Sequence, residues 1–340
     1  MNCDPSQLRL YFNEFPQPPP ANVIKAAREA LREANRYPED KLVGGLKNLI
    51  SSYAGLTPEN VHATSGGEYA FYELFTRLVR QGDSVILLEP TFTSYEPILK
   101  VLGAKIRKLR LQENGYRWIL DKDELFSLMR TEKPRLLVID DPNNPTASPM
   151  LADEDLVREV CSSFGGYLLL DEAYTEYAGY SASKLVPEID NLVVFRTMSK
   201  AFALAGMRVS ILLATKQLIE SIEGFSPRFE LSRPSLAAAV EALSDPSYAF
   251  RNADFIKSER ERVRRALRPV NGLKVYESFT NFVLMRFNYP QLIDSLKIRL
   301  MRPTFDRQYA RLSIGSKLEN NCAVSALRDS LNSDKQSAKA

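Results

Sequence analysis

The residues best suited to chemistry lie between Thr197 and Arg208, just after the apolar run from Leu192 to Phe195. This short stretch offers a lysine, two hydroxyls and an arginine. Lys200 is followed directly by apolar residues, and an amine in such surroundings loses hydration, so its charged form is disfavoured. An amine whose pKa falls from roughly 10.4 towards neutrality can act as a nucleophile or form a Schiff base.

Arg208 and the hydroxyls of Thr197 and Ser199 suit a phosphate, which needs positive charge and hydrogen-bond donors. Together with Lys200 they favour a phosphate-bearing aldehyde, for which the obvious candidate is pyridoxal 5'-phosphate. A solvated surface lysine is the ordinary alternative for so short a motif. The rest of the chain must decide between the two interpretations.

The first two thirds of the chain alternate apolar strands with helices. Near-continuous apolar strands separated by helices predict an α/β fold, in which a mostly parallel sheet is covered on both faces. Ligands gather beyond the carboxyl ends of such strands. We therefore expect the residues that follow strand ends to converge in one crevice, and these are Phe92, Asn144, Asp171 and Lys200. The strands are expected at residues 84–88, 105–111, 135–140, 167–170, 192–195 and 208–214.

The pattern changes after about residue 225, where short strands at 273–275, 282–286 and 311–314 indicate a smaller α+β domain. We expect residues 1–35 to form an N-terminal arm and part of the small domain. The large cofactor-binding domain is predicted at residues 36–225, the small C-terminal domain at 226–331, and a frayed polar tail at 332–340.

Composition excludes several classes of function. The 340 residues are 44% hydrophobic and 26% charged, which is typical of a globular protein. The net charge of +3 is too small to indicate nucleic-acid binding. No apolar run approaches the roughly 20 residues that span a bilayer, and the N-terminus lacks a signal-peptide pattern. We expect neither a nucleic-acid partner nor a membrane partner.

The single histidine, His62, lies in a strand-like run, for which a structural role is expected. A multi-histidine metal site or a serine–histidine triad is therefore not predicted, and acid–base chemistry would use lysine, carboxylates or tyrosine. The three cysteines, Cys3, Cys161 and Cys322, are scattered and odd in number. They argue against a disulfide scaffold or a zinc cage and fit a reducing cytoplasm.

Each candidate residue has a defined role around the ring of the cofactor. Asp171 beneath the pyridine nitrogen would keep it protonated and make the ring an electron sink, although aspartate is also a common helix cap. Tyr174 and the Asn144 amide could bond the phenolic oxygen. Phe92 would stack on the ring, and Lys200, once released, could move a proton at the reacting carbon.

The phosphate would be held by the backbone amides of Gly67 and Glu68, where a helix begins, together with Ser199 and Arg208; Thr197 is a weaker candidate. An ordinary helix cap is the alternative at that helix start. Arg311 could pair bidentately with a substrate carboxylate, or lie at the rim of the site.

These motifs together resemble the class I/II, fold-type I, pyridoxal-phosphate-dependent aminotransferases. Among these, the chain is most similar to the histidinol-phosphate aminotransferase family. The resemblance is carried by Asp-Pro-Asn-Asn-Pro-Thr at 141–146, Asp-Glu-Ala-Tyr at 171–174, and the Thr-Met-Ser-Lys to Arg stretch at 197–208. Phe-Asn-Glu-Phe-Pro at 12–16 and Arg-Tyr-Pro-Glu at 36–39 resemble further family elements.

The resemblance implies an aspartate aminotransferase-like large domain with a seven-stranded sheet and a homodimer with shared active sites. It implies that Tyr37 reaches the phosphate of the neighbouring subunit's cofactor. It places Asn13 at the substrate entrance, with Tyr11 beside it. Arg302 would lie near the substrate phosphate and Arg311 at the amino-acid carboxylate.

Two positions depart from the family, which usually has glycine where this chain has Ala147 and Ser210. The resemblance gives no role to Arg233.

The resemblance predicts transfer of an amino group between histidinol phosphate and 2-oxoglutarate or glutamate, in histidine biosynthesis. A threonine-phosphate decarboxylase or an aromatic amino-acid aminotransferase would share Lys200, Asp171 and Arg208, so both stay open. A non-catalytic ligand-binding protein on the same scaffold is the third possibility. The combination of Lys200, Asp171 and Tyr174 argues against it, because ligand sensing alone does not need a Schiff base and an electron sink.

Overall fold

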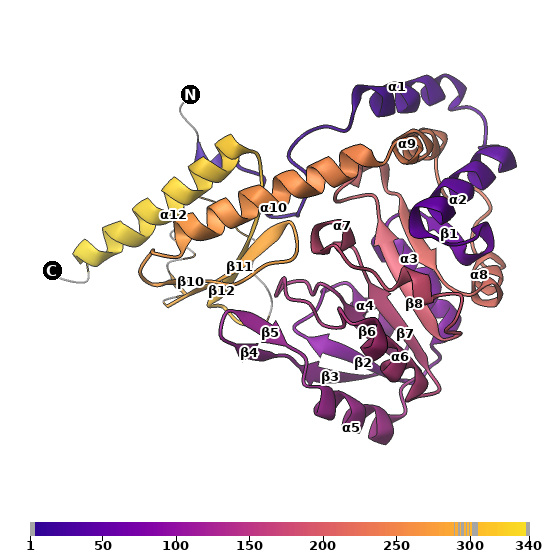
Figure 1. Cartoon of the computed structure of the whole chain (residues 1–340), viewed down its shortest axis with the longest axis horizontal. Coiled ribbons are helices and arrows are strands. Elements are labelled where there is room, and N and C mark those ends of the chain that lie inside the picture. The colour runs from indigo at the N-terminus through magenta and orange to yellow at the C-terminus, as the bar shows by residue number, and fades with distance from the viewer. Residues whose placement is uncertain are drawn as a thin grey trace.

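The computed structural model describes residues 4–288, 290, 291, 293, 296, 298, 300 and 305–337. Its largest element is a seven-stranded sheet in the order β1-β9-β8-β7-β6-β2-β3 (Figure 1). Only β9 runs antiparallel to its neighbours, while β8, β7, β6, β2 and β3 are parallel to one another. The predicted α/β class and mostly parallel sheet are confirmed. The strands are β1 (Val61–Thr64), β2 (Ser84–Glu89), β3 (Lys105–Arg110), β6 (Leu136–Asp140), β7 (Tyr167–Asp171), β8 (Leu192–Thr197) and β9 (Ser210–Leu213).

Two apolar layers cover the two faces of this sheet. Because side chains alternate along a strand, Val138 and Leu169 face one layer while Leu137 and Leu168 face the other. The first layer contains α3 (Gly67–Leu78), α4 (Tyr95–Val101) and α8 (Lys216–Glu223). The second contains α2 (Asp40–Ala54), α5 (Lys122–Glu132), α6 (Glu154–Ser162) and α7 (Thr175–Ala178). Burial on both faces explains why β6, β7 and β8 read as apolar runs without alternation.

A second sheet of three antiparallel strands forms the core of the C-terminal part. It consists of β10 (Leu273–Val275), β11 (Phe282–Phe287) and β12 (Tyr309–Ser313). Two long helices, α10 (Ser247–Leu267) and α12 (Lys317–Ser337), lie side by side over it (Figure 1). The backbone of α12 continues past residue 331, where a frayed tail is predicted, because the polar residues that follow include neither glycine nor proline.

The N-terminal helix α1 (Ala21–Ala30) packs on α9 (Arg233–Ser244), which also contacts α2. Helix α1 is followed directly by a 3-10 turn, Leu31–Glu33. Further 3-10 turns occur at Pro5–Gln7, Pro58–Asn60, Ser183–Leu185 and Ala205–Met207.

A small hairpin of β4 (Gln112–Asn114) and β5 (Arg117–Ile119) was not expected from the sequence. Its anchor is Glu113, which accepts hydrogen bonds from Tyr276 at 2.9 Å and Tyr309 at 3.1 Å and pairs with Arg286 at 3.1 Å. The hairpin is thereby fastened to the three-stranded sheet.

Two expectations about the chain as a whole can be compared with the described residues. None of the helices in that part of the chain combines the length and apolarity needed to cross a membrane. Cys161 is a buried free thiol, whereas Cys322 is disulfide-bonded. The scattered cysteines argue against a disulfide scaffold, and the disulfide at Cys322 departs from that argument.

Gly166, just before β7, supports a stability prediction. A methyl group there would lie 2.2 Å from the carbonyl oxygen of Pro134 and 2.7 Å from that of Arg135, whereas one on Gly165 would meet nothing within 4 Å. We expect Gly166→Ala to lower the free energy of unfolding by about 1–3 kcal/mol, because backbone must move, and Gly165→Ala to change it far less. Urea denaturation of both variants measures this, and equal effects would contradict the packing.

Candidate active site

A cavity of about 530 Å³ lies beyond the carboxyl ends of the parallel strands. Most of the predicted site residues line it, although they come from distant parts of the chain. Those that line it are Gly67, Glu68, Phe92, Asn144, Asp171, Tyr174, Thr197, Ser199, Lys200 and Arg208. The sheet topology therefore brings them together, as the strand-end argument expects.

Lys200 stands in the turn after β8, with its amine beside the N-terminal arm. Nζ donates hydrogen bonds to the carbonyl oxygens of Asn13 at 3.2 Å and Phe12 at 3.3 Å. Burial and the positive charge of Arg311 lower the pKa of Lys200 to about 8, although Glu14 and Asp171 act in the opposite direction. The amine is thus partly neutral near physiological pH, as a nucleophile or a proton carrier requires.

Asp171 is the last residue of β7, and its buried carboxyl group faces the cavity. It accepts a hydrogen bond from the Tyr95 hydroxyl and one from the Ala173 amide at 2.9 Å. Burial raises the pKa of Asp171 to about 6, while these bonds and the charge of Lys200 limit the rise. A carboxylate so supported can pair with a protonated ring nitrogen.

Two residues of this region were missed from the sequence. Tyr95 is not among the predicted site residues, yet it is fully buried and bonds Asp171. Asp140 ends β6 directly opposite Asp171 in the sheet register and also lines the cavity. Its carboxylate accepts bonds from the Asn144 amide and the Thr91 hydroxyl, both at 2.8 Å. Burial raises its pKa to about 7. The available signal was its place at the end of an apolar strand, the same signal that identified Asp171.

Tyr174 and Asn144 line the cavity and are hydrogen-bonded by residues that do not line it. The Asn13 side-chain amide donates to the Tyr174 hydroxyl at 2.9 Å, and Arg311 donates to the Asn144 side-chain oxygen. Arg311 also donates to the Tyr11 carbonyl oxygen at 3.1 Å. Asn13 and Arg311 are thus buried next to the ring-facing residues and do not line the cavity itself.

The opposite end of the cavity is suited to an anion. The amide-bearing start of α3 at Gly67 has no side-chain cap, so its first N–H groups are open to a ligand. A methyl group at Gly66, whose φ is 85°, would lie 2.3 Å from Arg208 Nη2. Nearby, the Thr197 hydroxyl bonds the Ser199 hydroxyl at 3.0 Å. We call residues 65–68 the 65–68 loop.

Among the predicted site residues that the structure describes, one lies apart from the cavity and its neighbours. Tyr37 is 74% exposed and stacks on Phe229 with ring centroids 4.3 Å apart. Arg233, which had no assigned role, donates a hydrogen bond to the Tyr37 carbonyl oxygen at 3.0 Å and pairs with Glu33. Arg302 falls outside the described residues.

The model of the family described as aminotransferase class I and II matches residues 5–327. The chain belongs to this family. It is 37% identical to a histidinol-phosphate aminotransferase of Sulfurisphaera tokodaii, over 91% of this chain and 86% of that relative. It is 30% identical to histidinol-phosphate aminotransferase 2 of Archaeoglobus fulgidus, over 96% and 94% of the two chains.

The fold also matches that of solved aminotransferases. The histidinol-phosphate aminotransferase of Sinorhizobium meliloti, solved in complex with pyridoxal-5'-phosphate, gives a TM-score of 0.86 at 24% identity, over 96% of this chain and 91% of that one. The aspartate aminotransferase of Thermus thermophilus in complex with maleate gives 0.81 at 21% identity, over 94% and 90%. The aspartate aminotransferase-like fold predicted from the motifs is thus confirmed.

Pyridoxal 5'-phosphate is the cofactor of this aminotransferase family, and the cavity fits it. An amine with a lowered pKa, a buried carboxylate and an uncapped helix start are the three groups that an aldehyde, a pyridine nitrogen and a phosphate require. Arg311 adds a buried Nε that has no hydrogen-bond partner among the described residues. This donor lies beside the ring-facing residues and does not reach the cavity itself.

Removing the Tyr95 hydroxyl tests whether its hydrogen bond lowers the pKa of Asp171. That hydroxyl lowers the pKa of Asp171 against the larger effect of burial. In Tyr95→Phe the pKa of Asp171 should rise from about 6, so the carboxylate is protonated at a higher pH. The acid limb of the pH profile of kcat/KM should move up by about one unit, since a hydrogen bond to a charged group is worth roughly 1.5–3 kcal/mol.

The matched control is Tyr72→Phe, which removes an exposed tyrosine hydroxyl from the same side of the molecule. Its pH profile should coincide with that of the unaltered enzyme. An acid limb that stays in place in Tyr95→Phe would contradict the assignment of that limb to Asp171.

Proposed function

We propose that this enzyme transfers an amino group between histidinol phosphate and 2-oxoglutarate, with glutamate as the amino-acid partner, as a step of histidine biosynthesis. The observation that carries the proposal is the similarity to the Sulfurisphaera tokodaii enzyme along nearly the whole chain. Several other curated relatives are also named histidinol-phosphate aminotransferases, which supports the choice of substrate.

The chemistry follows from the side chains around the cavity. When bound, pyridoxal phosphate withdraws electrons from the carbon that carries the amino group. Lys200 first holds the cofactor, and its amine, with a pKa of about 8, then accepts the proton of that carbon and delivers it again. Asp171 would keep the ring nitrogen of the cofactor protonated. Tyr174 and Asn144 would bond its phenolic oxygen, and Phe92 would lie against the ring.

The remaining residues hold the anionic groups. Arg208, Ser199 and the amides of Gly67 and Glu68 bind the cofactor phosphate, with Thr197 behind them. Arg311 receives the carboxylate of the amino-acid substrate. Asn13 shapes the same entrance through its bond to Tyr174. The resemblance assigns Arg302, which lies outside the described residues, to the substrate phosphate.

We further propose a homodimer in which Tyr37 reaches the phosphate of the neighbouring subunit's cofactor. The proposal is supported by the exposure of Tyr37 and by its fixed position between Phe229 and Arg233. An exposed aromatic side chain held in this way suits an interface. The predicted domain boundaries and the cytoplasmic location stay part of the proposal.

Half-reactions with single substrates test the reaction. Mixed with the cofactor-loaded enzyme, glutamate and histidinol phosphate should each convert bound pyridoxal phosphate to pyridoxamine phosphate, which the loss of its visible absorbance reports. Phosphothreonine and phenylalanine should react at least about tenfold more slowly, because discrimination by a few contacts is worth 1–3 kcal/mol.

Lys200→Ala is the control, since it should bind the cofactor through the phosphate contacts and give no turnover. Release of carbon dioxide from phosphothreonine would instead favour the decarboxylase, and preferential reaction of phenylalanine the aromatic aminotransferase.

Tyr37→Phe tests the assembly. If the Tyr37 hydroxyl bonds the partner's phosphate, its loss should speed release of the cofactor about tenfold, the equivalent of about 1.4 kcal/mol. Tyr72→Phe is again the control, with unchanged release. Size-exclusion chromatography with light scattering checks the dimer, and a fully active monomer would refute the cross-subunit contact.

A further inference from the structure

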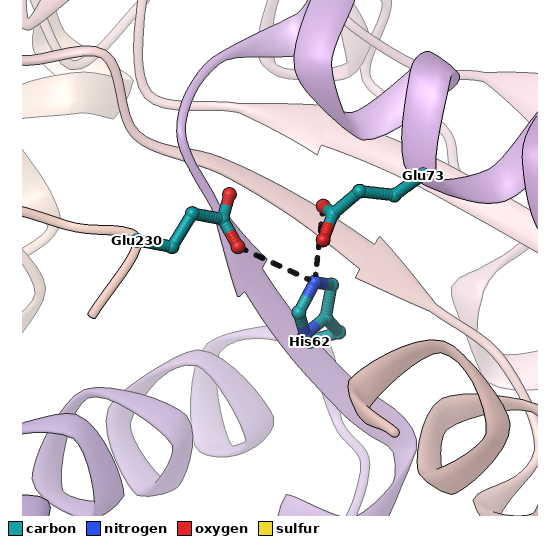
Figure 2. A group of neighbouring side chains, drawn as sticks. All are labelled: His62, Glu73 and Glu230. Atoms are coloured by element: carbon teal, nitrogen blue, oxygen red, sulfur yellow. Dashed lines mark hydrogen bonds and ion pairs between the residues drawn. The ribbon is translucent and has the colours of Figure 1, made fainter. Parts of the chain in front are cut away.

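The only histidine of the chain is buried in a cluster of carboxylates behind the 65–68 loop. His62 is 5% exposed and belongs to β1 (Figure 2). Its Nε2 lies 3.2 Å from a carboxylate oxygen of Glu73, on α3, and 3.9 Å from one of Glu230. On the other side of the ring, Nδ1 lies 3.5 Å from Glu223 of α8.

With carboxylates at both ring nitrogens, the imidazole is held in its charged form. Burial by itself would lower the pKa of His62, but the hydrogen bonds to Glu223 and Glu73 and the charges of Glu73 and Glu230 outweigh it and raise the pKa to about 9. Lys47 of α2, 2.6 Å from Glu223, supplies the other positive charge facing this group. The imidazolium is therefore the charge that balances Glu73 and Glu230.

Glu230 connects this cluster to the cofactor site. One of its oxygens accepts hydrogen bonds from the backbone amide of Ser65 and from the hydroxyl of Thr64. Ser65 is the first residue of the 65–68 loop and precedes Gly66, where there is no room for a side chain beside Arg208. The Glu230 carboxylate thus fixes the position of the Ser65 backbone, at the start of the 65–68 loop.

The bond between the Glu230 carboxylate and the Ser65 amide depends on the positive charge of His62. Burial already raises the pKa of Glu230, and the charge of Glu73 raises it further, whereas His62 lowers it. If His62 were neutral, two buried carboxylates would face each other and one would take up a proton. A protonated or displaced Glu230 is a weaker acceptor for the Ser65 amide, so the loop would lose its anchor.

We propose that His62 is a positioning residue for the cofactor phosphate: through Glu230 it fixes the 65–68 loop in the shape that receives the anion. The inference rests on the proposed phosphate site at Gly67, Glu68 and Arg208. It gives the cluster a role in the affinity for the cofactor, beyond holding β1 to α3.

The test compares two ligands of the protein freed of cofactor: pyridoxal phosphate, and pyridoxal, which lacks the phosphate. At pH 7, His62→Gln should raise the Kd of pyridoxal phosphate about tenfold and that of pyridoxal less than about twofold, because only the phosphate contacts the loop. A general loss of structure would weaken both ligands alike, and this outcome would overturn the proposal.

Glu230→Gln should give the same selective loss, and the double variant should be no worse than either single one, because both act through one contact. Glu220→Gln is the matched control: it removes an exposed carboxylate from α8, the helix that carries Glu223, without touching His62 or the loop, and should leave both Kd values within about twofold. If His62→Gln does not fold, Glu230→Gln alone decides. Additive losses would contradict the proposed connection.

The pH dependence has a defined sign. The raised pKa means that the charge of His62 is present at pH 7 and is lost as the pH rises through about 9. The ratio of the Kd of His62→Gln to that of the unaltered protein should therefore fall towards one above this pH. Groups that titrate in the same range, such as Lys200, are common to both proteins and cancel in the ratio.

The remaining outcomes separate this inference from the function itself. If the unaltered protein does not prefer pyridoxal phosphate to pyridoxal, the proposed phosphate site fails. If it does and His62→Gln keeps the same preference, only the role of His62 fails. His62, Glu73 and Glu230 also lie close enough to share a metal ion. Stoichiometric zinc or manganese bound by the unaltered protein and lost in His62→Gln would replace the proposal with a metal site.

Discussion

The structure depends on keeping one amine out of water without giving it a direct carboxylate partner. A buried lysine that meets a carboxylate becomes a stable ion pair with a high pKa, whereas one that is only desolvated is readily deprotonated. Lys200 is desolvated without an ion pair, because its amine donates to the neutral carbonyl oxygens of Phe12 and Asn13. The positive charge of Arg311 lowers the pKa further.

The N-terminal arm supplies these carbonyl oxygens, and Asn13 fastens the arm to both sheets. The Asn13 amide nitrogen bonds the Ser313 hydroxyl at 2.9 Å, and its carbonyl oxygen accepts from Asn281 at 2.9 Å, so the arm is fixed to β12 and the start of β11. The Asn13 side chain meanwhile reaches Tyr174, which follows β7 of the large sheet. The environment of Lys200 is therefore a property of the joined sheets, and β8 alone could not create it.

The strand-end rule explains why much of the site could be predicted from the sequence. A parallel sheet gathers the residues that follow its strands, so the positions of Asn144, Asp171 and Lys200 needed only the correct strand boundaries. The same sheet also separates neighbouring residues. Asp171 faces the cavity, whereas Glu172 points away from it and forms a buried ion pair with Arg196 at 3.3 Å.

What could not be predicted depends on contacts between distant residues. The bond of Tyr95 to Asp171 spans 76 residues and that of Thr64 to Glu230 spans 166, and no local pattern encodes either. The β4–β5 hairpin was not predicted for a similar reason. Its strands are short and polar, so strand propensity does not predict them. They are held by the contact of Glu113 with a sheet whose residues follow more than 150 positions later in the chain.

The two departures from the family pattern have opposite physical consequences. Ala147 adopts a φ of 61°, the left-handed conformation that glycine takes freely, which explains why glycine is usual there and costs about 1–2 kcal/mol. Ser210 adds a hydroxyl that donates to Thr197 at 3.0 Å, and Thr197 in turn bonds Ser199. Each hydroxyl has a single proton, so when Thr197 donates to Ser199 and not to the Val209 carbonyl oxygen at 3.4 Å, the Ser199 proton is left free for an anion. Ala147 therefore strains the backbone near Asn144, whereas Ser210 strengthens the donor set at the phosphate end, and neither changes a side chain that lines the cavity.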